Sequence, residues 1–556
     1  MFFSIMPPKI LKIHPKDNLI VALAPLIAGE TVTWGDERYE IVYDVPPKHK
    51  FATPDLAPED PAYMYGVTVG RAMVPIRKGE PVTTTNLRHD TQRYDEHRRQ
   101  RSAWPAPDVS RWQNATFMGY PRANGSVGTA NYWLFIPLVF CENRNINVIR
   151  EALIQKLGYD RSRAYDFDVQ TLVQKHRDGA SEDELLTSEI IITAEDIQRK
   201  RAFPNVDGIK FLTHEGGCGG TRFDSTTLCA LFAGYITNPN VAGATVLSLG
   251  CQNAEVITLQ QEIQKRDPGF SKPLYILEQQ KSRSERDFIA EAIKQTFVGL
   301  TEANRLQRQP TSLSKLVVGL ECGGSDGFSG ISANPAVGHA ADLLVALGGS
   351  VILSEFPELC GVEQELTDRC VDEATANKFV SLMQAYSQSA KAVGSGFDAN
   401  PSPGNIKDGL ITDAIKSAGA AKKGGTSPVA DVLDYTEPAT QSGLNLLCTP
   451  GNDVESTTGL AGSGATVILF TTGLGTPTGN AAAPTLKISS NTALATRMSD
   501  IIDIDAGTVI TGEDTITTKG EEILEYIIRT ASGEYTPKAV RLGQDDFIPW
   551  KRGVSL

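Results

Sequence analysis

The stretch LVVGLECGGSDG, from Leu316 to Gly327, decides the fold of this chain. It opens with a short run of Leu and β-branched residues and continues into Cys322, two glycines and the pair Ser325 and Asp326. Such a run predicts a buried strand of a parallel sheet, and the glycines after it predict a tight loop at the carboxyl end of that strand. Loops at the carboxyl ends of strands line the ligand crevice of open α/β sheets. The stretch therefore predicts an α/β body whose site lies in these loops.

Three upstream segments follow the same design. One apolar run ends at Cys141, a second leads into the loop THEGGCGG with His214 and Cys218, and a third ends at Cys251. With Cys322 they make four cysteines at predicted strand ends, and we expect them to meet although the first and last are 181 positions apart (322 minus 141).

Thiolates bind soft and borderline metals, either as single ions or in iron–sulfur clusters. The four cysteines are therefore candidate metal ligands, and for each of them burial as a small apolar side chain is the alternative. The remaining cysteines lack the strand-and-glycine context, so we expect them to pack in the core: Cys229, Cys360, Cys370 and Cys448.

Length and composition limit the class of protein. A chain of 556 residues is too long for one hydrophobic core, and about two to four domains are expected. The net charge of −13 (53 basic and 66 acidic residues) argues against nucleic acid or an anionic membrane as the main partner, and it permits an enzyme of small molecules. The sequence contains no run of about 18 apolar residues, so it predicts no membrane-spanning helix. Eight cysteines without dense spacing fit reduced thiols in the cytoplasm.

The chain divides into four parts by its local patterns. Residues 1–90 contain short β-like runs between turn signals and predict a small β-rich module. Residues 91–115 are charged, contain proline and lack apolar periodicity, so they predict an exposed linker. Strands alternate with helices in 116–268 and again in 269–556, which predicts two α/β domains with parallel sheets. The charged segment 160–201 within the first of these domains is expected to be helical and peripheral.

Polar residues beside the predicted strand ends could carry chemistry. His214 shares a loop with Glu215 and Cys218, so it is a candidate base or metal ligand, although a lone histidine is more often structural. Glu355 is the last residue of the predicted strand SVILSE and lies at its carboxyl end. His14 stands in the cluster HPKDN of the β-rich module, where a turn position and a binding role have equal weight. The glycine pairs expose backbone N–H groups that can hold a carboxylate or a phosphate.

Taken in order, these motifs resemble the altronate and galactarate dehydratase family of sugar-acid hydro-lyases. The matching segments are HPKDN, GYPRANGSVGTANY, THEGGCGG, LGCQN, GLECGGSDGFSGISANPA, the pair Ser354 and Glu355, PSPGN, KGGTSP, TPGNDVESTTG, FTTGLGTPTG and PTLKISSN. The resemblance implies an N-terminal β-module of the SAF type, a linker and a two-part catalytic body. It also implies dehydration of an aldonic or aldaric acid to a 2-keto-3-deoxy acid, with a divalent metal that is usually iron.

This resemblance sets the expected activity and site. D-altronate is the first-choice substrate, with 2-keto-3-deoxy-D-gluconate as product, and galactarate is the second. The expected cofactor is Fe²⁺, with Mn²⁺ or an iron–sulfur cluster as alternatives, and a homo-oligomer is compatible with the family. The implied roles are proton transfer for His14, His214 and Glu355, metal binding for Cys141, Cys218, Cys251 and Cys322, and sugar-acid binding for Gly323, Gly324, Ser325, Asp326, Asn405 and Lys487.

Two positions depart from the family pattern and leave the substrate open. Thr85 stands where a histidine is frequent, and Leu474 stands where the loop after the FTTG strand usually carries arginine. Two rival functions follow. One is a lyase that expels another group, such as sulfite from a sulfonated hydroxy acid, and the other is a sugar-acid-binding protein without turnover.

Overall fold

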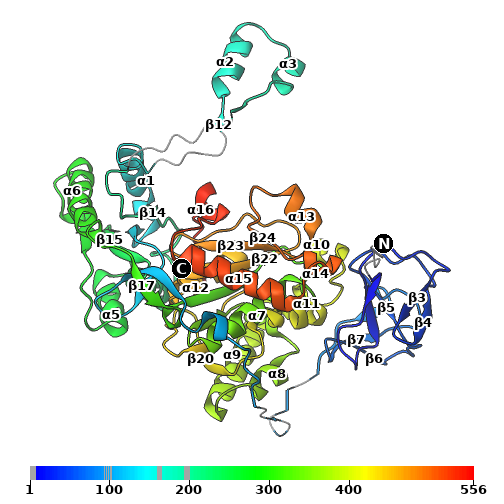
Figure 1. The fold of residues 1–556 in the computed structure, drawn as a ribbon. Coiled ribbons are helices and arrows are strands. Elements are labelled where there is room, and N and C mark those ends of the chain that lie inside the picture. Colours follow the sequence, from blue (N-terminus) through cyan, green and yellow to red (C-terminus); the bar gives the residue numbers. More distant parts are fainter. Residues whose placement is uncertain are drawn as a thin grey trace.

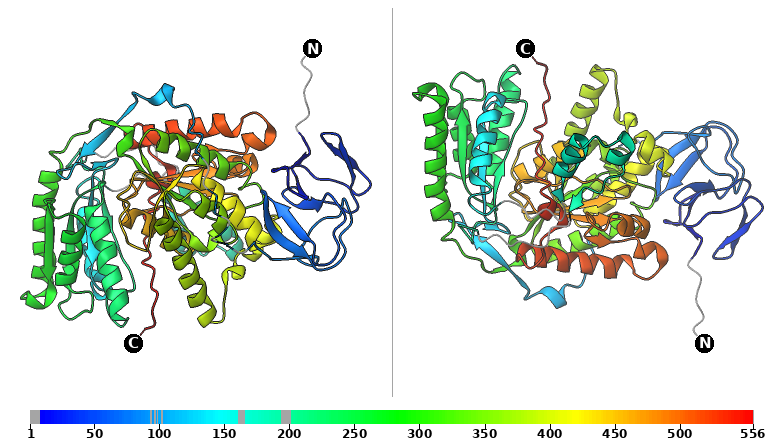
Figure 2. Two further views of the ribbon diagram at one scale, coloured as in Figure 1. Left: turned by 90° about the horizontal axis from the view of Figure 1, so that it is seen from below. Right: turned by 90° about the horizontal axis from the view of Figure 1, so that it is seen from above.

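A computed structural model describes residues 8–92, 94–95, 97, 99–100, 103–159, 166–192 and 201–555. The chain forms an N-terminal β-module, a domain around a four-stranded parallel sheet and a C-terminal domain around a seven-stranded parallel sheet. Figures 1 and 2 show the β-module and the four-stranded domain on opposite sides of the C-terminal domain. This architecture confirms the predicted fold class.

The β-module consists of short antiparallel strands joined by turns. Its strands form the sheets β1-β2-β5 and β6-β7-β8 and the hairpin β3-β4. Their bounds are β1 (Ile10–Leu11), β2 (Leu19–Ala22), β3 (Thr31–Trp34), β4 (Glu37–Glu40), β5 (Lys50–Ala52), β6 (Pro61–Met64), β7 (Val67–Ala72) and β8 (Leu87–Arg88). Part of its apolar interior, including Leu19 and Met64, is continuous with the core of the C-terminal domain. The module is therefore docked on that domain by buried apolar contact.

The second domain is built on parallel strands in the order β14-β11-β15-β16. The strands are β11 (Tyr132–Pro137), β14 (Gly208–Phe211), β15 (Val241–Ser248) and β16 (Leu274–Glu278), and the helices are α1 (Asn143–Leu153), α4 (Arg222–Thr237), α5 (Val256–Arg266) and α6 (Glu285–Ala303). Because β16 pairs with β15 and α6 packs against both strands, the domain continues to residue 303. The boundary predicted at 268 and 269 is corrected accordingly.

The segment predicted to be helical and peripheral forms a small arm. It contains β12 (Asp166–Phe167), α2 (Val169–Arg177), α3 (Glu182–Leu186) and β13 (Ile191–Ile192). Figure 1 shows α2 and α3 standing apart from the rest of the domain. Residues 160–165 and 193–200 of the predicted segment lie outside the described residues. The described part of the arm agrees with the prediction.

The C-terminal domain has an all-parallel sheet in the order β20-β21-β19-β18-β22-β23-β24. Its strands are β18 (Val317–Cys322), β19 (Ser350–Leu353), β20 (Val429–Leu433), β21 (Gly443–Leu447), β22 (Val467–Thr472), β23 (Thr485–Ser489) and β24 (Ile504–Asp505). The helices α7 (Ala333–Ala346) and α15 (Ile516–Ala531) pack together on one face, and α12 (Asp453–Gly462) packs on the other. Both faces of β18 are thereby buried, as its continuous apolar run predicts.

The two α/β domains meet where α12 packs against α4. A Cβ atom on Gly234 of α4 would lie 2.0 Å from the carbonyl oxygen of Gly462 in α12. Only glycine allows the backbones to approach this closely. A further sheet, β10-β9-β17, connects the starts of the two domains through β9 (Thr116–Pro121), β10 (Val127–Gly128) and β17 (Gln309–Ser312).

The connections of the large sheet reverse direction between β18 and β22. The chain leaves β18 towards β19 on one side and leaves β22 towards β23 on the other, so a crevice is expected at their carboxyl ends. The loops after these strands are joined, because Gly323 N–H donates to Thr471 O (3.0 Å) and Gly473 and Leu474 N–H donate to Gly324 O (3.0 and 2.9 Å). The stretch quoted first therefore lies at this reversal point.

The predicted exposed linker is instead fastened to the C-terminal domain over much of its described length. Arg99 donates to the carbonyl oxygens of Thr367, Cys370 and Asp372 at 2.8–2.9 Å. Arg111 and Trp112 bind carboxylates of α15. The charged side chains that suggested a solvated tether in the sequence serve here as anchors, together with Trp112. Separately, none of the described helices has the length and apolar character needed to cross a membrane.

Candidate active site

The structure brings three of the four candidate cysteines to one sheet edge. Cys141, Cys218 and Cys251 follow the neighbouring strands β11, β14 and β15, and all three are exposed. Their loops are hydrogen-bonded, since Phe140 N–H donates to Gly216 O (3.0 Å) and the N–H groups of Asn253 and Ala254 donate to Gly217 O (3.0 and 3.1 Å). A cavity of about 420 Å³ lies beside Cys218, between this loop and the C-terminal segment that carries Trp550 and Lys551.

Cys322 lies apart from that edge, because its strand belongs to the other sheet. Its thiol is buried and donates to Glu358 Oε2 at 3.2 Å. Among these four described thiols, no three sulfur atoms lie within 4.8 Å of one another. The expected meeting of all four cysteines around one metal ion is therefore corrected: the parallel strands that carry them are divided between two sheets.

A buried group of charged side chains, here called the acidic cluster, occupies the carboxyl edge of the seven-stranded sheet. Glu355 Oε2 accepts hydrogen bonds from Lys423 Nζ (2.5 Å) and from Cys322 N–H (3.1 Å). Glu358 Oε1 accepts from Lys416 Nζ at 2.6 Å. The members of the acidic cluster are Glu321, Cys322, Glu355, Glu358, Lys416, Lys423 and Asp453.

Glu355 has a strained backbone. Its φ of 67° lies in the left-handed region, which side chains other than glycine rarely adopt. The conformation is held because Glu355 N–H donates to Thr449 Oγ1 (2.8 Å) while the carboxylate binds Lys423. Strain of this kind is concentrated at functional sites. The predicted role of Glu355 in proton transfer stays a prediction.

The charges of the acidic cluster do not balance. Four carboxyl groups face two lysines, so two negative charges are in excess if all carboxyl groups and lysines are ionised and the Cys322 thiol is neutral. The Oε1 atoms of Glu321 and Glu355 are buried and have no hydrogen-bond partner among the described residues. Buried negative charge of this kind must be removed by protonation or matched by a cation.

The pKa values show how the excess charge is distributed. Burial, reinforced by the charge of Glu355, raises the pKa of Glu321 well above its ordinary value. Burial together with the charges of Glu355 and Glu358 raises the pKa of Asp453 to about 7. Glu358 behaves oppositely, because Lys416 and Lys423 overcome the effect of burial and lower its pKa. Asp453 is therefore one member of the acidic cluster that can change protonation near neutral pH.

The acidic cluster fits the divalent metal that the family resemblance implies. Ligand atoms of Cys322, Glu355 and Glu358 lie within 4.8 Å of one another, and all three side chains are buried. Thiolate and carboxylate ligands suit iron and manganese. A dication would offset two of the excess negative charges, and the unpartnered Glu355 Oε1 is available to bind it.

The glycine loop after β18 offers a binding place for an anion next to Asp453. The N–H groups of Gly324 and Ser325 donate no hydrogen bond to any described residue. A Cβ atom on Gly323 would lie 2.0 Å from Asp453 Oδ2, so only glycine allows the carboxyl group to sit against this loop. Successive free N–H groups beside a glycine with φ of +58° (Gly324) form a concavity that binds carboxylates.

The Asp326 side chain, which follows these N–H groups, has structural partners. The Asp326 carboxylate accepts from Ser329, Ser490, Asn491 and the Phe328 N–H, and it pairs with Lys48 of the β-module at 3.0 Å. Its hydrogen-bonding capacity is filled, so Asp326 fastens the module to the C-terminal domain.

Asn405 and Lys487 support the loops around the crevice. Asn405 Nδ2 donates to Ser325 O at 2.7 Å and thereby holds the loop after β18. Lys487 Nζ donates to Thr478 O, and burial lowers the pKa of this lysine to about 8. Their predicted contact with a sugar acid stays a prediction.

The two candidate histidines lie elsewhere. His214 Nε2 binds Pro137 O (2.7 Å) and its Nδ1 accepts from Gly216 N–H (2.9 Å), so both ring nitrogens hold the backbone. Burial lowers its pKa to about 4, which keeps the ring neutral. His14 lies in the β-module, where Nδ1 accepts from Lys16 N–H (3.1 Å). Their predicted proton-transfer roles stay predictions, and the geometry favours structural roles.

Sequence reasoning missed most of the acidic cluster. Glu321, Lys423 and Asp453 stand inside the motifs GLECGG, KGGTSP and TPGNDVESTTG, so motif membership alone could have singled them out. Glu358 and Lys416 stand in none of the motifs, and only the fold brings them to the site.

Comparison with known proteins gives matches along nearly the whole chain. Residues 8–90 match the altronate/galactarate dehydratase SAF domain, residues 119–304 match the second domain of D-galactarate dehydratase/altronate hydrolase, and residues 313–555 match the C-terminal domain of D-galactarate/altronate dehydratase. The second match ends close to the end of α6, in agreement with the corrected domain boundary.

Curated relatives agree with these matches. The chain is 33% identical to the altronate dehydratase of Escherichia coli (strain K12) over 98% of this chain and 99% of that protein. Identity to the altronate dehydratase of Bacillus subtilis (strain 168) is also 33%, with the same coverage. A galactarate dehydratase (L-threo-forming) of Escherichia coli (strain K12) is 38% identical over 53% of this chain and 57% of that protein. The chain therefore belongs to the altronate/galactarate dehydratase family of hydro-lyases.

Proposed function

We propose that this chain dehydrates a sugar acid, with D-altronate as substrate and 2-keto-3-deoxy-D-gluconate as product. The proposal is carried by the acidic cluster, in which strained Glu355 and titratable Asp453 lie at the carboxyl edge of the sheet beside free backbone N–H groups. Galactarate is the second candidate, because a galactarate dehydratase is among the relatives.

The substrate carboxylate binds the N–H groups of Gly324 and Ser325 in this proposal. That position places the neighbouring carbon near Asp453, whose carboxylate packs against Gly323. Asp453 takes the proton from this carbon at Oδ2 and returns it to the departing hydroxyl group, so that water leaves. A pKa that burial raises towards neutrality suits a group that must both accept and give a proton.

The other members of the acidic cluster set its charge. Cys322, Glu355 and Glu358 would hold the divalent ion, which we propose to be Fe²⁺ with Mn²⁺ as substitute. When bound, it would act as a Lewis acid towards the substrate oxygens. Lys423 and Lys416 orient the Glu355 and Glu358 carboxylates.

An assay of product formation tests the reaction. Protein purified without oxygen is incubated with Fe²⁺ and D-altronate, or with galactarate, and the 2-keto-3-deoxy acid is measured. Asp453→Asn is the inactive control. Absence of product with every aldonic and aldaric acid contradicts the proposal. Thermal stabilisation by a sugar acid without turnover would instead indicate a binding protein, and release of sulfite from a sulfonated hydroxy acid would indicate a sulfo-lyase.

A rival cofactor is an iron–sulfur cluster at the edge formed by Cys141, Cys218 and Cys251. Three exposed thiols on hydrogen-bonded loops, beside a cavity of about 420 Å³, favour this placement. Iron and acid-labile sulfide in the anaerobic protein distinguish the two cofactors: iron without sulfide supports the single ion. We further propose a cytoplasmic enzyme, because all eight cysteines are free.

A further inference from the structure

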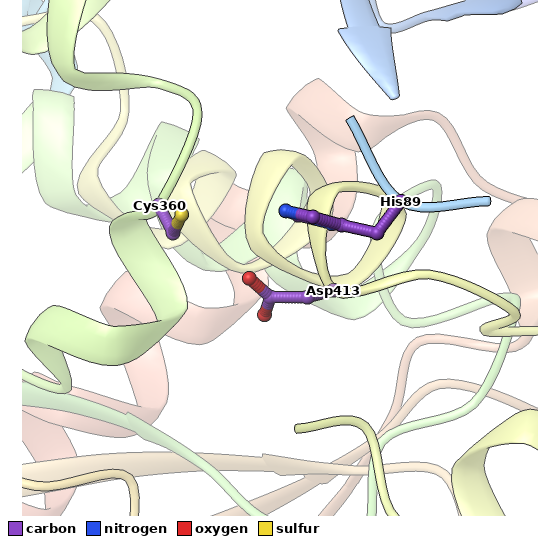
Figure 3. Close-up of side chains that lie close together, drawn as sticks. All are labelled: His89, Cys360 and Asp413. Carbon is purple, nitrogen blue, oxygen red and sulfur yellow. The ribbon is translucent and has the colours of Figure 1, made fainter. Parts of the chain in front are cut away.

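A second group of metal-ligating side chains lies outside the acidic cluster, where the β-module joins the linker. His89 follows β8 of the module, Cys360 follows the short helix η6 (Phe356–Leu359), and Asp413 is the first residue of α11 (Asp413–Ala420). One ligand atom from each lies within 4.8 Å of the other two. Figure 3 shows the three side chains pointing toward one another from three separate segments.

These three ligand types are those that borderline dications prefer. Imidazole nitrogen, thiolate sulfur and carboxylate oxygen bind Zn²⁺ and Fe²⁺. A tetrahedral site with bonds of about 2.0–2.3 Å needs ligand atoms about 3.3–3.8 Å apart. Since the three ligand atoms already lie within 4.8 Å, small side-chain rotations are enough to close the group around an ion.

Asp413 provides an independent sign of a missing partner. Its side chain belongs to a residue that is only 1% exposed, and its Oδ2 atom accepts no hydrogen bond of ordinary geometry from the described residues. The Cys360 thiol lies close enough to interact with the carboxyl group. Both groups are buried, which disfavours their ionised forms in the absence of a partner. A bound cation would stabilise their ionised forms instead.

His89 has one ring nitrogen available. Its Nδ1 accepts a long hydrogen bond from Ala414 N–H (3.3 Å), whereas Nε2 has no hydrogen bond to a described residue. Metal binding through Nε2 would move the ring proton to Nδ1 and give up that long bond. Asp398 lies near enough for its charge to act on both His89 and Cys360, which makes it a candidate fourth ligand.

We propose that His89, Cys360 and Asp413 bind one divalent transition-metal ion of the Zn²⁺ and Fe²⁺ class, which fastens the exit of the β-module to the C-terminal domain. Cys360 stands two residues after Glu358, and Asp413 stands three residues before Lys416. An ion here would therefore hold the two segments that carry the Glu358–Lys416 ion pair. The proposal is independent of the reaction that the acidic cluster performs.

Cobalt binding to the full-length protein tests this site. The protein is stripped of metal with a chelator and titrated with Co²⁺, and the thiolate-to-cobalt absorption band and the cobalt retained after gel filtration are measured. We expect Cys360→Ser and His89→Ala each to retain about one cobalt ion fewer per chain than the wild type. Cys229→Ser, the same change at a buried thiol of α4, should bind like the wild type.

Two further variants keep the result interpretable. Cys322→Ser removes a thiol of the acidic cluster, so its loss of cobalt should add to that of Cys360→Ser in the double variant. Asp413→Asn preserves the shape of the side chain and should lose the ion while keeping the wild-type circular dichroism. Unchanged cobalt binding and an unchanged absorption band in both Cys360→Ser and Asp413→Asn would overturn the proposal.

Discussion

At the scale of single residues, Asp453 controls the pH dependence of the proposed reaction. Its raised pKa of about 7 means that the carboxyl group is protonated below neutrality and ionised above it. Because proton removal requires the ionised form, we expect kcat/KM to rise with pH. A dication held by Glu355 and Glu358 would offset the charges that raise this pKa, so the rise should lie below pH 7 in the metal-loaded protein. Asp453→Asn should lower kcat by ~10²–10⁴-fold. Glu455→Gln, in the same turn of α12, serves as the matched control and should keep the wild-type kcat and the rise of kcat/KM with pH. A wild-type kcat/KM that does not change with pH would contradict the assignment of Asp453 as the base.

The ion pair of Lys423 and Glu355 is the second residue-scale test. Both side chains are 1% exposed, so Lys423→Met should leave a buried carboxylate without its partner and destabilise the protein by about 3–5 kcal/mol. Adding Glu355→Gln removes that charge and should restore part of the stability. Urea unfolding of the two single variants and the double variant measures the coupling. If the loss of unfolding free energy in the double variant equals the sum of the losses in the two single variants, Lys423 and Glu355 are not coupled.

Sequence reasoning reached some of these residues and not others for a physical reason. Glu355 was predicted, because the polar end of a buried strand is a local signal. Glu358 and Lys416 could not be predicted, because their ion pair joins a turn after β19 to a helix 58 positions away. The four cysteines share one local pattern, but a pattern cannot tell which sheet a strand enters, and β18 enters a different sheet from the other three.

At the scale of elements, the packing of α4 on α12 fixes how the two α/β domains meet. A Cβ atom on Gly234 would meet the backbone of Gly462 at 2.0 Å, so Gly234→Ala should force the helices apart. We expect a loss of about 1–3 kcal/mol in the free energy of unfolding, despite the better helix propensity of alanine. Gly269→Ala is the control, because its Cβ would have no neighbour closer than 3.8 Å. A Gly234→Ala variant as stable as the wild type would contradict this account.

Elements that depend on local sequence are predictable, and those that depend on remote partners are not. Alternating strands and helices predicted both parallel sheets, because that alternation is local. The sequence alone does not locate the domain boundary after α6, because only the pairing of β16 with β15 assigns β16 and α6 to the second domain. The anchoring of the linker is not predictable from local sequence, because the carbonyl partners of Arg99 lie in residues 367–372, remote along the chain.

At the scale of the whole molecule, a buried lysine couples the docking of the β-module to pH. Lys50 of β5 is 1% exposed and donates to Gly409 O of the C-terminal domain at 2.7 Å. Burial lowers its pKa from 10.5 to about 7, and the charge of Asp326 only partly opposes this. Between these two values the unfolded chain binds a proton that the folded chain does not, so this lysine makes stability rise as the pH increases from about 7 towards 10.

Lys50→Met tests this coupling, because methionine fills a similar volume without a charge. We expect the wild-type melting temperature to gain more between pH 7 and pH 9.5 than that of Lys50→Met, since the variant lacks the titrating group. Lys9→Met, which removes an exposed lysine paired with Glu30 in the same module, should follow the wild type. Groups that titrate in all three proteins contribute equally to each melting temperature, so their contribution is absent from the difference between two proteins. If Lys50→Met and the wild type keep a constant difference in melting temperature over this range, Lys50 is charged in the interface and Asp326 compensates for its burial in full.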